Sequence, residues 1–426
     1  MRQKPNRPVL VLLLSVMAGL LVLGGGTAAR VETIKFAIWD YSLSPEYKEA
    51  IESFQKENPG IKVKVIDTSS KEYVDKVTVM LAAGEDVDVI AIKDMPSFAG
   101  YVGRKQLLAL DAFVRRSRLD LKNYGGFVEA LRVNHRLYGL PYRSDLLILY
   151  YNKDIFDKAK VPYPGNDMTW DQFRKIAKKL TSGEGNAKVY GAYVHTWKSM
   201  ATNLGVARYG GKYTLVGGRY GFLKPVYELL LKMQNEDKSI MSFAEAKTTS
   251  AHYRTQFEAG KAGMIYMGTW HIGQLISDKK AGKHNINWGI VRAPRFPDQK
   301  PGCTVGLVTP CGINAKSKKP EAAWKFISFL GGEKGAKIFA RHGVLPALRT
   351  KPILDIYTSL EGFPAGGAAA LEANQVYLEF PVHPKGPMID KILQEEHELI
   401  MIGQKTIDQG LADMEKRIKE VLEEEL

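Results

Sequence analysis

The sequence predicts an α/β protein with more than one lobe. The chain has 426 residues, of which 45% are hydrophobic and 25% are charged. This is an ordinary globular composition on a chain too long for one compact core. The opening alternates between strand and helix patterns, which is typical of a mostly parallel sheet covered by helices. A mainly helical middle section follows, and strand patterns then resume.

Two strand patterns frame the first predicted helix. The stretch TIKFAIWD (33–40) is a short apolar run rich in β-forming residues, and IKVKVI (61–66) alternates with a period of two. Between them, Ser44 and Pro45 suit the N-cap and the first position of a helix. The rest of this opening is expected to contain a helix over 71–83 and an apolar strand over 88–92.

The later elements follow from capping and periodicity. Thr169 and Gln172 have the spacing of a capping box, which predicts a helix that starts there. The stretch 361–374 is biased towards Gly and Ala and indicates a loop with one short helix. Further helices are expected over 222–234, in PEAAWKFISFLGG (320–332) and over 407–421, and further strands over 286–293 and 303–315.

The N-terminus has the three parts of a secretory signal. A basic MRQKPNR precedes an apolar run of fifteen residues, Val9 to Leu23, and GGGTAAR follows. Cleavage is expected after Ala28 or Ala29, which makes residues 1–29 a signal peptide. The alternative is an uncleaved anchor, but the run is shorter than the ~20 residues that a spanning helix needs. The mature chain is therefore expected in the periplasm or at the cell surface, and no cysteine at the junction offers a lipid attachment site.

The charge pattern excludes some partners. Removal of the signal would lower the formal charge from +14 to +11, since Arg2, Lys4 and Arg7 are lost without any acid. The remaining Lys and Arg are scattered among acids, which indicates a solvated surface and no nucleic-acid partner. A Gly-rich phosphate loop that ends in Gly-Lys-Ser/Thr is also absent from the sequence.

Two cysteines, Cys303 and Cys311, lie in one predicted strand. Eight extended steps of about 3.3 Å would separate them by roughly 26 Å, whereas a disulfide needs Cα atoms within ~7 Å. Gly306 and Pro310 could instead break the strand and permit a turn. We favour two free thiols.

Five stretches in a fixed order resemble one family across nearly the whole mature chain. The stretches are LYGLPYRSDLLILYYNKDIF (137–156), MTWDQFRKIAKKLT (168–181), FEAGKAGMIYMGTW (257–270), SKKPEAAWKFISFL (317–330) and HGVLPA (342–347). With them the chain looks like the extracellular solute-binding proteins, family 1, the maltose-binding-protein-like proteins that supply sugars and oligosaccharides to ABC importers. The resemblance implies a two-lobed periplasmic-binding-protein fold of type II, with three interlobe crossings and a ligand cleft between the lobes.

The resemblance also implies where the lobes divide and how the protein works. The crossings should fall near 144–147, 305–309 and 345–348. The protein would be a monomer that needs no cofactor, closes around a carbohydrate and delivers it to the membrane subunits of an ABC permease. The expected units are a signal peptide (1–29), an N-terminal lobe (30–145 plus 310–345) and a C-terminal lobe (146–309 plus 346–426).

Three charged residues are candidates for binding sugar hydroxyls, because hydrogen bonds to charged groups are strong. Asp94 follows a probable parallel strand at the sheet edge where ligands gather. Its alternative role is to cap the next helix. Asp145 and Arg143 lie at the first expected crossing, and the alternative for Asp145 is a surface loop charge.

Aromatic candidates are expected to stack on the C–H faces of a sugar. Trp270 follows Gly268-Thr269 at the end of an apolar run, and in the resembled family the corresponding indole enters the cleft. For Trp270 and Trp39 the alternative is core packing, and Trp170, Trp288 and Trp324 are expected to be structural. The other ligand-binding candidates are Trp39, Trp197, Tyr377 and Phe380.

Two other functions remain open. A secreted glycoside hydrolase would also carry aromatics and carboxylates, but the sequence lacks the common catalytic motifs and its eight histidines look isolated, so we expect neither an enzyme nor a metal site. The same fold could instead bind an acidic ligand, such as a uronate oligosaccharide or a glycerol phosphate compound. The net charge and Arg143 would suit that ligand.

Overall fold

The computed structural model describes residue 1 and residues 31–124 and 126–424, so the predicted signal peptide lies, apart from Met1, outside the described residues. The strands are β1 (Glu32–Trp39), β2 (Ile61–Thr68), β3 (Val89–Ala91), β4 (Arg132–Val133), β5 (Arg136–Leu137), β6 (Leu140–Asn152), β7 (Met264–Gly268), β8 (Trp288–Arg292), β9 (Cys303–Ile313) and β10 (Gln375–Leu378). The helices are α1 (Pro45–Glu57), α2 (Tyr73–Ala83), α3 (Met95–Gly103), α4 (Asp111–Ser117), α5 (Phe127–Ala130), α6 (Lys153–Ala159), α7 (Trp170–Leu180), α8 (Ser199–Arg208), α9 (Lys224–Leu231), α10 (Phe243–Thr248), α11 (Tyr253–Glu258), α12 (Trp270–Lys280), α13 (Pro320–Gly331), α14 (Glu333–Arg341), α15 (Lys351–Thr358), α16 (Gly386–Met401) and α17 (Ile407–Glu423).

The central sheet is mixed: the parallel arrangement expected for the opening strands is confirmed for β1, β2 and β3, but it does not extend to the rest of the sheet. Its main path runs β2-β1-β3-β9-β6-β7, while β8 pairs with β6 and β10 pairs with β9. The pairs β1–β2, β1–β3 and β9–β10 are parallel. The long strands β6 and β9 run antiparallel to each other, and β9 is also antiparallel to β3. The antiparallel pairing of these two strands therefore makes the sheet a mixed one.

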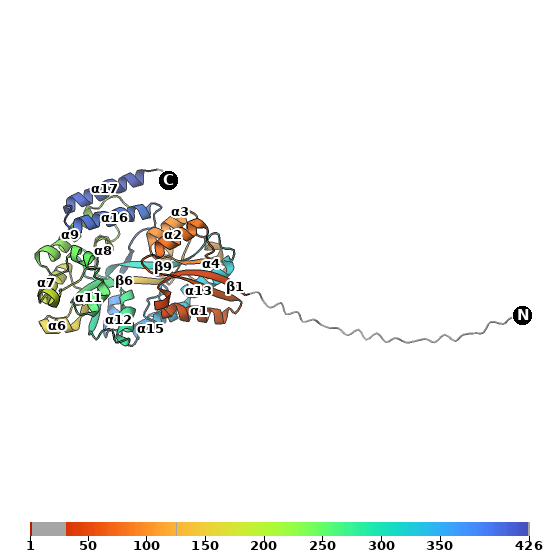
Figure 1. Cartoon of the computed structure of the whole chain (residues 1–426), viewed down its shortest axis with the longest axis horizontal. Coiled ribbons are helices and arrows are strands. Elements are labelled where there is room, and N and C mark those ends of the chain that lie inside the picture. The colour runs from red at the N-terminus through yellow and green to blue at the C-terminus, as the bar shows by residue number, and fades with distance from the viewer. Residues whose placement is uncertain (2–30, 125, 425–426) are drawn as a thin grey trace.

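Strand β6 passes from one half of the molecule to the other. Its first part, Leu140–Leu146, pairs with β9, and its second part, Leu147–Asn152, pairs with β7 and β8. Strand β9 does the same in reverse, from β10 at Cys303 to β3 at Ile313. Figure 1 shows both strands crossing the centre of a two-lobed molecule.

A third segment joins the two long strands at the centre. The Ser144 N–H donates to the Leu345 carbonyl (3.0 Å), and the Ala347 N–H donates to the Tyr142 carbonyl (3.1 Å). Gly306 of β9 allows β10 and β6 to approach closely, because a Cβ there would overlap the Val376 side chain and lie 3.2 Å from the Asp145 carbonyl oxygen. The three connecting segments thus lie side by side where the halves meet.

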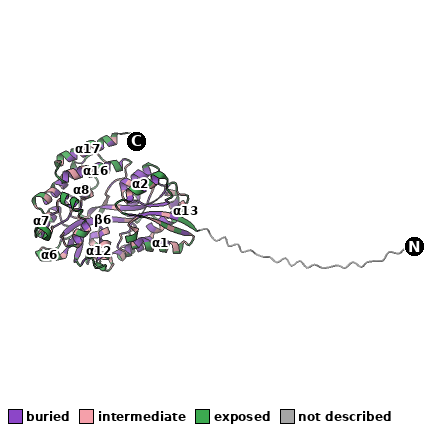
Figure 2. Cartoon of the chain, viewed as in Figure 1, coloured by how far each residue is buried: buried purple, intermediate pink, exposed green. Residues whose placement is uncertain are grey.

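Helices from distant parts of the sequence cover the first half of the sheet. Phe326 of α13 meets Phe36 of β1 and Phe54 of α1, each with ring centroids 5.1 Å apart. Figure 2 shows buried residues along the strands and exposed ones on the outward faces of helices such as α1 and α7. The helix that begins at Pro320 therefore packs on the N-terminal sheet although it follows the sequence of the second half.

Several local predictions are confirmed. Helix α1 starts with Pro45 at its first position, and Thr169 and Gln172 form the expected capping box of α7. The expected loop at 361–374 contains a short 3₁₀ helix, Gly367–Leu371. The tryptophans expected to pack in the core are buried, with exposed fractions of 4–5%; they are Trp170, Trp288 and Trp324.

The cysteines are two free thiols, as predicted. Cys303 and Cys311 lie on one uninterrupted strand, β9, and both are buried. Burial raises the pKa of the Cys311 thiol well above its ordinary value. Within the described part of the chain, no helix combines the length and the apolar character that crossing a membrane requires.

Candidate functional site

The Gly268-Thr269-Trp270 corner connects β7 to the crossing in β6. Thr269 is completely buried, and its N–H donates to the Leu146 carbonyl (2.9 Å). Its hydroxyl accepts from the Leu146 N–H (3.2 Å) and donates to Asp145 Oδ1 (2.8 Å). Threonine thus fixes the end of β7 against the first connecting segment.

The glycine of this corner makes room for the indole. A Cβ built at Gly268 would fall among the ring carbons of Trp270, so a residue larger than glycine would displace the ring. Trp270 is the first residue of α12 and is partly exposed. The absence of a side chain at Gly268 therefore lets the indole pack over the end of β7.

Trp270 belongs to a cluster of aromatic rings in the second half. Its centroid lies 6.4 Å from that of Trp197, a large apolar side chain with 40% exposure. The ring of Tyr253 lies 5.8 Å from Trp197, and its hydroxyl accepts a hydrogen bond from Trp270 Nε1 (3.1 Å). Flat rings with one exposed side suit the apolar faces of a sugar.

An ion pair borders this cluster. Arg143 Nε donates to Asp145 Oδ2 (3.0 Å), and the two side chains are 16% and 4% exposed. Burial raises the pKa of Asp145, while Arg143 and the Thr269 hydroxyl act in the opposite direction. Both carboxylate oxygens of Asp145 are thus bonded inside the protein.

Asp94 caps helix α3 and faces the other half. Its Oδ1 accepts from the Ser97 N–H (2.8 Å), which is the capping role considered from the sequence. Its pKa is raised by burial, and the negative charge of Asp390 on α16 contributes to the increase. Asp390 is itself paired with Lys198 (2.6 Å), the residue after Trp197. The Lys198–Asp390 ion pair therefore joins the segment after Trp197 to helix α16, whose charge acts on Asp94.

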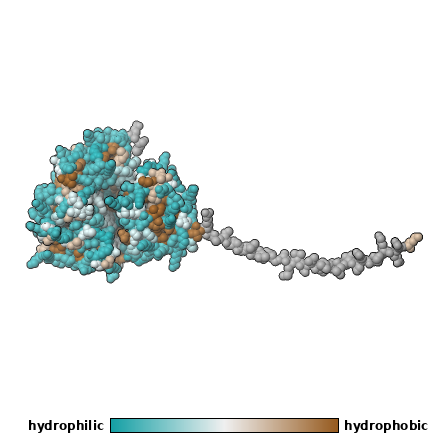
Figure 3. Space-filling model, in the orientation of Figure 1, coloured by the Kyte–Doolittle hydropathy of each residue, from teal (hydrophilic) through white to brown (hydrophobic). Residues whose placement is uncertain are grey.

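Glu379 is a further buried carboxyl near Lys198. Asn203 Nδ2 donates to Glu379 Oε1 (3.1 Å), while the other polar atom of the Asn203 side chain, Oδ1, is buried without a partner. Burial raises the pKa of Glu379, and the charge of nearby Lys198 counteracts it. Figure 3 shows a furrow in the surface between the two halves.

The structure brings several predicted site residues together. Trp270, Trp197, Arg143 and Asp145 are linked through Thr269 and Tyr253, while Asp94 is influenced by the charge of Asp390, the ion-pair partner of Lys198. The other three make different contacts: Trp39 packs edge-to-face on Tyr73 (5.1 Å), Tyr377 lies against Gly210 and Gly211, and Phe380 is buried beside Gly386. The ligand-binding roles of all eight candidates remain predictions.

Sequence reasoning missed the residues that connect the candidates. Thr269, Lys198 and Glu379 are immediate neighbours of candidate aromatics, so attention to polar residues beside Trp197, Trp270 and Phe380 could have found them. Tyr253 and Asp390 give no such signal, because only the tertiary fold brings them to the site.

The expectation that the histidines are isolated was wrong. His195 and His252 have ring centroids 5.1 Å apart, and His195 also lies 4.4 Å from Trp197 and 5.4 Å from Tyr253. The pKa of His195 is lowered to about 3 by burial and by His252. Within the described ranges, no group of three or more His, Cys, Asp or Glu side chains is arranged to hold a metal ion.

We expect His195 to make the folded protein less stable as the pH is lowered. Because its folded pKa is lowered to about 3, between that value and ~6.5 the unfolded chain binds a proton that the folded chain does not. From pH 7 to pH 5 this histidine should lower the free energy of unfolding by about 2 kcal/mol. In urea unfolding, the loss of unfolding free energy between pH 7 and pH 5 should be smaller by that amount in His195→Gln than in the wild type. His135→Gln, which changes an exposed histidine, is the control and should behave like the wild type. Equal losses in all three proteins would contradict this role of His195.

The mixed sheet, the paired connecting segments and the aromatic and charged cluster beside them define a two-lobed solute-binding protein. The chain belongs to the bacterial extracellular solute-binding protein family, whose sequence pattern matches residues 40–337.

Three relatives show the range of this similarity. A sugar transporter from Rhizobium etli, crystallised in an open conformation, is 40% identical with a TM-score of 0.80, and the match covers 91% of this chain and 99% of that one. The galactooligosaccharide-binding protein of Bacillus subtilis is 24% identical over 71% of this chain and 70% of its own. The sn-glycerol-3-phosphate-binding periplasmic protein of Escherichia coli is 24% identical over 93% of this chain and 94% of its own.

Proposed function

We propose that this protein is the extracytoplasmic substrate-binding component of an ABC importer, which captures a sugar or oligosaccharide and delivers it to a membrane permease. The observation that carries the proposal is the pair of rings, Trp197 and Trp270, held beside the Arg143–Asp145 ion pair where the halves meet. The names of the Rhizobium etli and Bacillus subtilis relatives support a sugar. The protein would act as a monomer without enzymatic activity, after removal of the signal peptide.

The lobes we propose are 30–145 plus 310–345 and 146–309 plus 346–426. The change of partner in β6 between Leu146 and Leu147 supports the first boundary. Closure of one lobe over a ligand held by the other would form the state that the permease binds. To move the open–closed equilibrium from 1:99 to 99:1 requires about 5.5 kcal/mol, which a few hydrogen bonds of about 1 kcal/mol each and one or two stacked rings can supply.

The charges at the site favour a neutral sugar over an acidic ligand. Arg143 and Lys198 are already paired with carboxylates, and the neighbouring Arg349 donates to the Ser144 hydroxyl and has its pKa lowered to about 10, mainly by burial. Burial raises the pKa values of Asp94 and Glu379, so a further negative charge nearby would be unfavourable. The glycerol phosphate relative nevertheless keeps an acidic ligand as the alternative to be tested.

A ligand screen with a measure of shape tests the proposal. We expect maltose, maltotriose, galactooligosaccharides or arabinooligosaccharides to raise the melting temperature of the mature protein. The same sugar should reduce the radius of gyration measured by small-angle X-ray scattering, because closure makes the molecule more compact. Oligogalacturonate and sn-glycerol 3-phosphate form the acidic arm. Stabilisation by the acidic arm alone would contradict a neutral ligand, and cleavage of an oligosaccharide would contradict the purely binding role.

A further inference from the structure

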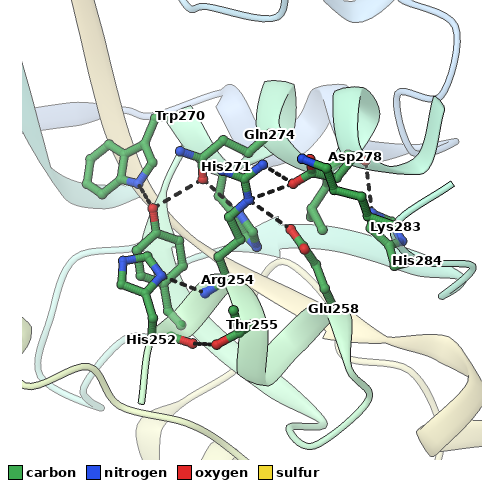
Figure 4. Close-up of polar contacts among 12 residues, drawn as sticks. His252, Arg254, Thr255, Glu258, Trp270, His271, Gln274, Asp278, Lys283 and His284 are labelled. Carbon is green, nitrogen blue, oxygen red and sulfur yellow. Dashed lines mark hydrogen bonds and ion pairs between the residues drawn. The ribbon is translucent and has the colours of Figure 1, made fainter. Parts of the chain in front are cut away.

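The edge of the Trp270 indole is held by a short series of hydrogen bonds between α11 and α12. Trp270 Nε1 donates to the Tyr253 hydroxyl, and this hydroxyl meets Gln274 Oε1, each at 3.1 Å. His271 Nδ1 lies 3.1 Å from the same Gln274 oxygen. Figure 4 shows Trp270, His271 and Gln274 at the start of α12, beside the segment that carries His252 and Arg254.

The chemistry of these groups fixes the direction of every hydrogen bond. An indole N–H can only donate, so the Tyr253 oxygen accepts from Trp270 and directs its single O–H to Gln274. With the Gln274 amide oriented so that Oε1 faces both groups, this oxygen accepts and His271 carries its proton on Nδ1. This tautomer leaves a bare Nε2, which is buried without a partner.

Burial keeps His271 in that neutral form. The residue is completely buried, and its pKa is lowered to about 3, mainly by burial. Its proton on Nδ1 is therefore available to the Gln274 oxygen across the ordinary pH range. The acceptor of Tyr253 is thus itself held by a second hydrogen bond.

The ring of Tyr253 is enclosed by other rings. Tyr253 is 4% exposed, and its ring lies 4.2 Å from His252, 5.1 Å from His271 and 5.4 Å from His195, centroid to centroid. Close packing of this kind restricts side-chain rotamers. The indole of Trp270 is consequently bonded to a buried and closely packed group, while its own ring stays partly exposed.

We propose that Tyr253, held by Gln274 and His271, is the positioning residue that fixes the plane of the Trp270 indole. Because the indole N–H is used inside the protein, Trp270 offers a ligand only the face of its ring and no hydrogen-bond donor. A ring fixed before binding loses less conformational freedom when a ligand stacks on it. The consequence for ligand affinity rests on the proposed function, whereas the hydrogen bonds themselves do not.

Tyr253→Phe tests the positioning, because it removes the hydroxyl and keeps the ring. In the ligand-free protein we expect the indole ¹H–¹⁵N resonance of Trp270, assigned by its absence in Trp270→Phe, to shift and to exchange faster with water. Gln274→Leu should produce a smaller shift, and Gln274→Glu, which keeps an acceptor for Tyr253 and His271, should restore the wild-type resonance. An unchanged Trp270 resonance in Tyr253→Phe would overturn the proposal.

The affinity arm uses the sugar that stabilises the wild-type protein most in a panel of maltose, maltotriose, galactooligosaccharides and arabinooligosaccharides. An indole that must be ordered during binding costs about 1 kcal/mol more, so Tyr253→Phe should weaken binding about fivefold. Tyr220→Phe is the matched control, because it also removes a buried tyrosine hydroxyl bond (to the Leu215 carbonyl, 2.7 Å). Equal losses in both variants would overturn the positioning role. If no sugar in the panel binds the wild type, that result counts against the proposed function, and the indole resonance still decides the role of Tyr253.

Discussion

Trp270→Ala is expected to weaken sugar binding by roughly 30- to 150-fold, which corresponds to about 2–3 kcal/mol for the lost contact of one large ring. The indole is held on both sides: Gly268 makes room for the ring, and Tyr253 accepts its N–H. A sugar would therefore meet a surface that already has its bound shape. Isothermal titration calorimetry of the best sugar from the ligand screen measures the effect.

Two variants make this measurement specific. Trp270→Phe keeps a flat ring, and should retain more affinity than Trp270→Ala. Tyr163→Ala removes another partly exposed ring from the same half, one that is 45% exposed and packs on Tyr151 and Phe156, and should leave the affinity unchanged. If Trp270→Ala binds within threefold of the wild type, stacking on this ring is not the basis of binding.

Local patterns predicted local structure well. The capping box at Thr169 and the proline at the start of α1 act within one helical turn, so the sequence carries all the information that they need. The same holds for the corner at Gly268, because a strand end followed by a ring is a local feature. These predictions did not require knowledge of which strands are neighbours.

Features that depend on distant partners were not predicted. The pattern of 303–313 indicates a strand but not its direction, and the antiparallel pairing of β9 with β3 and β6 decides that the sheet is mixed. His195 and His252 look isolated in the sequence because they meet only after folding. Asp390 was missed for the same reason, since α16 brings it opposite Asp94.

The ion pair at the first crossing shows the same limit. Asp145 was considered from the sequence either as a sugar-binding acid or as a surface loop charge. The structure buries it and bonds one oxygen to Arg143 and the other to Thr269. The prediction that it binds ligand is untested. Its two hydrogen bonds inside the protein indicate that it also stabilises the fold.

Asp145→Ala is expected to lower the free energy of unfolding by about 3–5 kcal/mol, because it leaves the largely buried Arg143 without a counter-charge. The Thr269 hydroxyl would also lose its acceptor at the end of β7. Urea unfolding followed by fluorescence measures the change. Asp355→Ala is the matched control, since Asp355 forms a comparably close ion pair with Lys351 (2.7 Å, against 3.0 Å for Arg143–Asp145) but the two side chains are 58% and 84% exposed; this surface pair should contribute less than about 1 kcal/mol.

The double variant separates the charge effect from the loss of contacts. When Arg143 is removed as well, its uncompensated charge is also removed and only Arg349 still loses the attraction of Asp145, so Arg143→Ala combined with Asp145→Ala should cost less than the two single changes added together. The difference measures the coupling between the two side chains. If Asp145→Ala instead keeps the wild-type stability and loses sugar affinity, Asp145 acts on the ligand. The ion pair would then not be what holds the end of β7 against the crossing in β6.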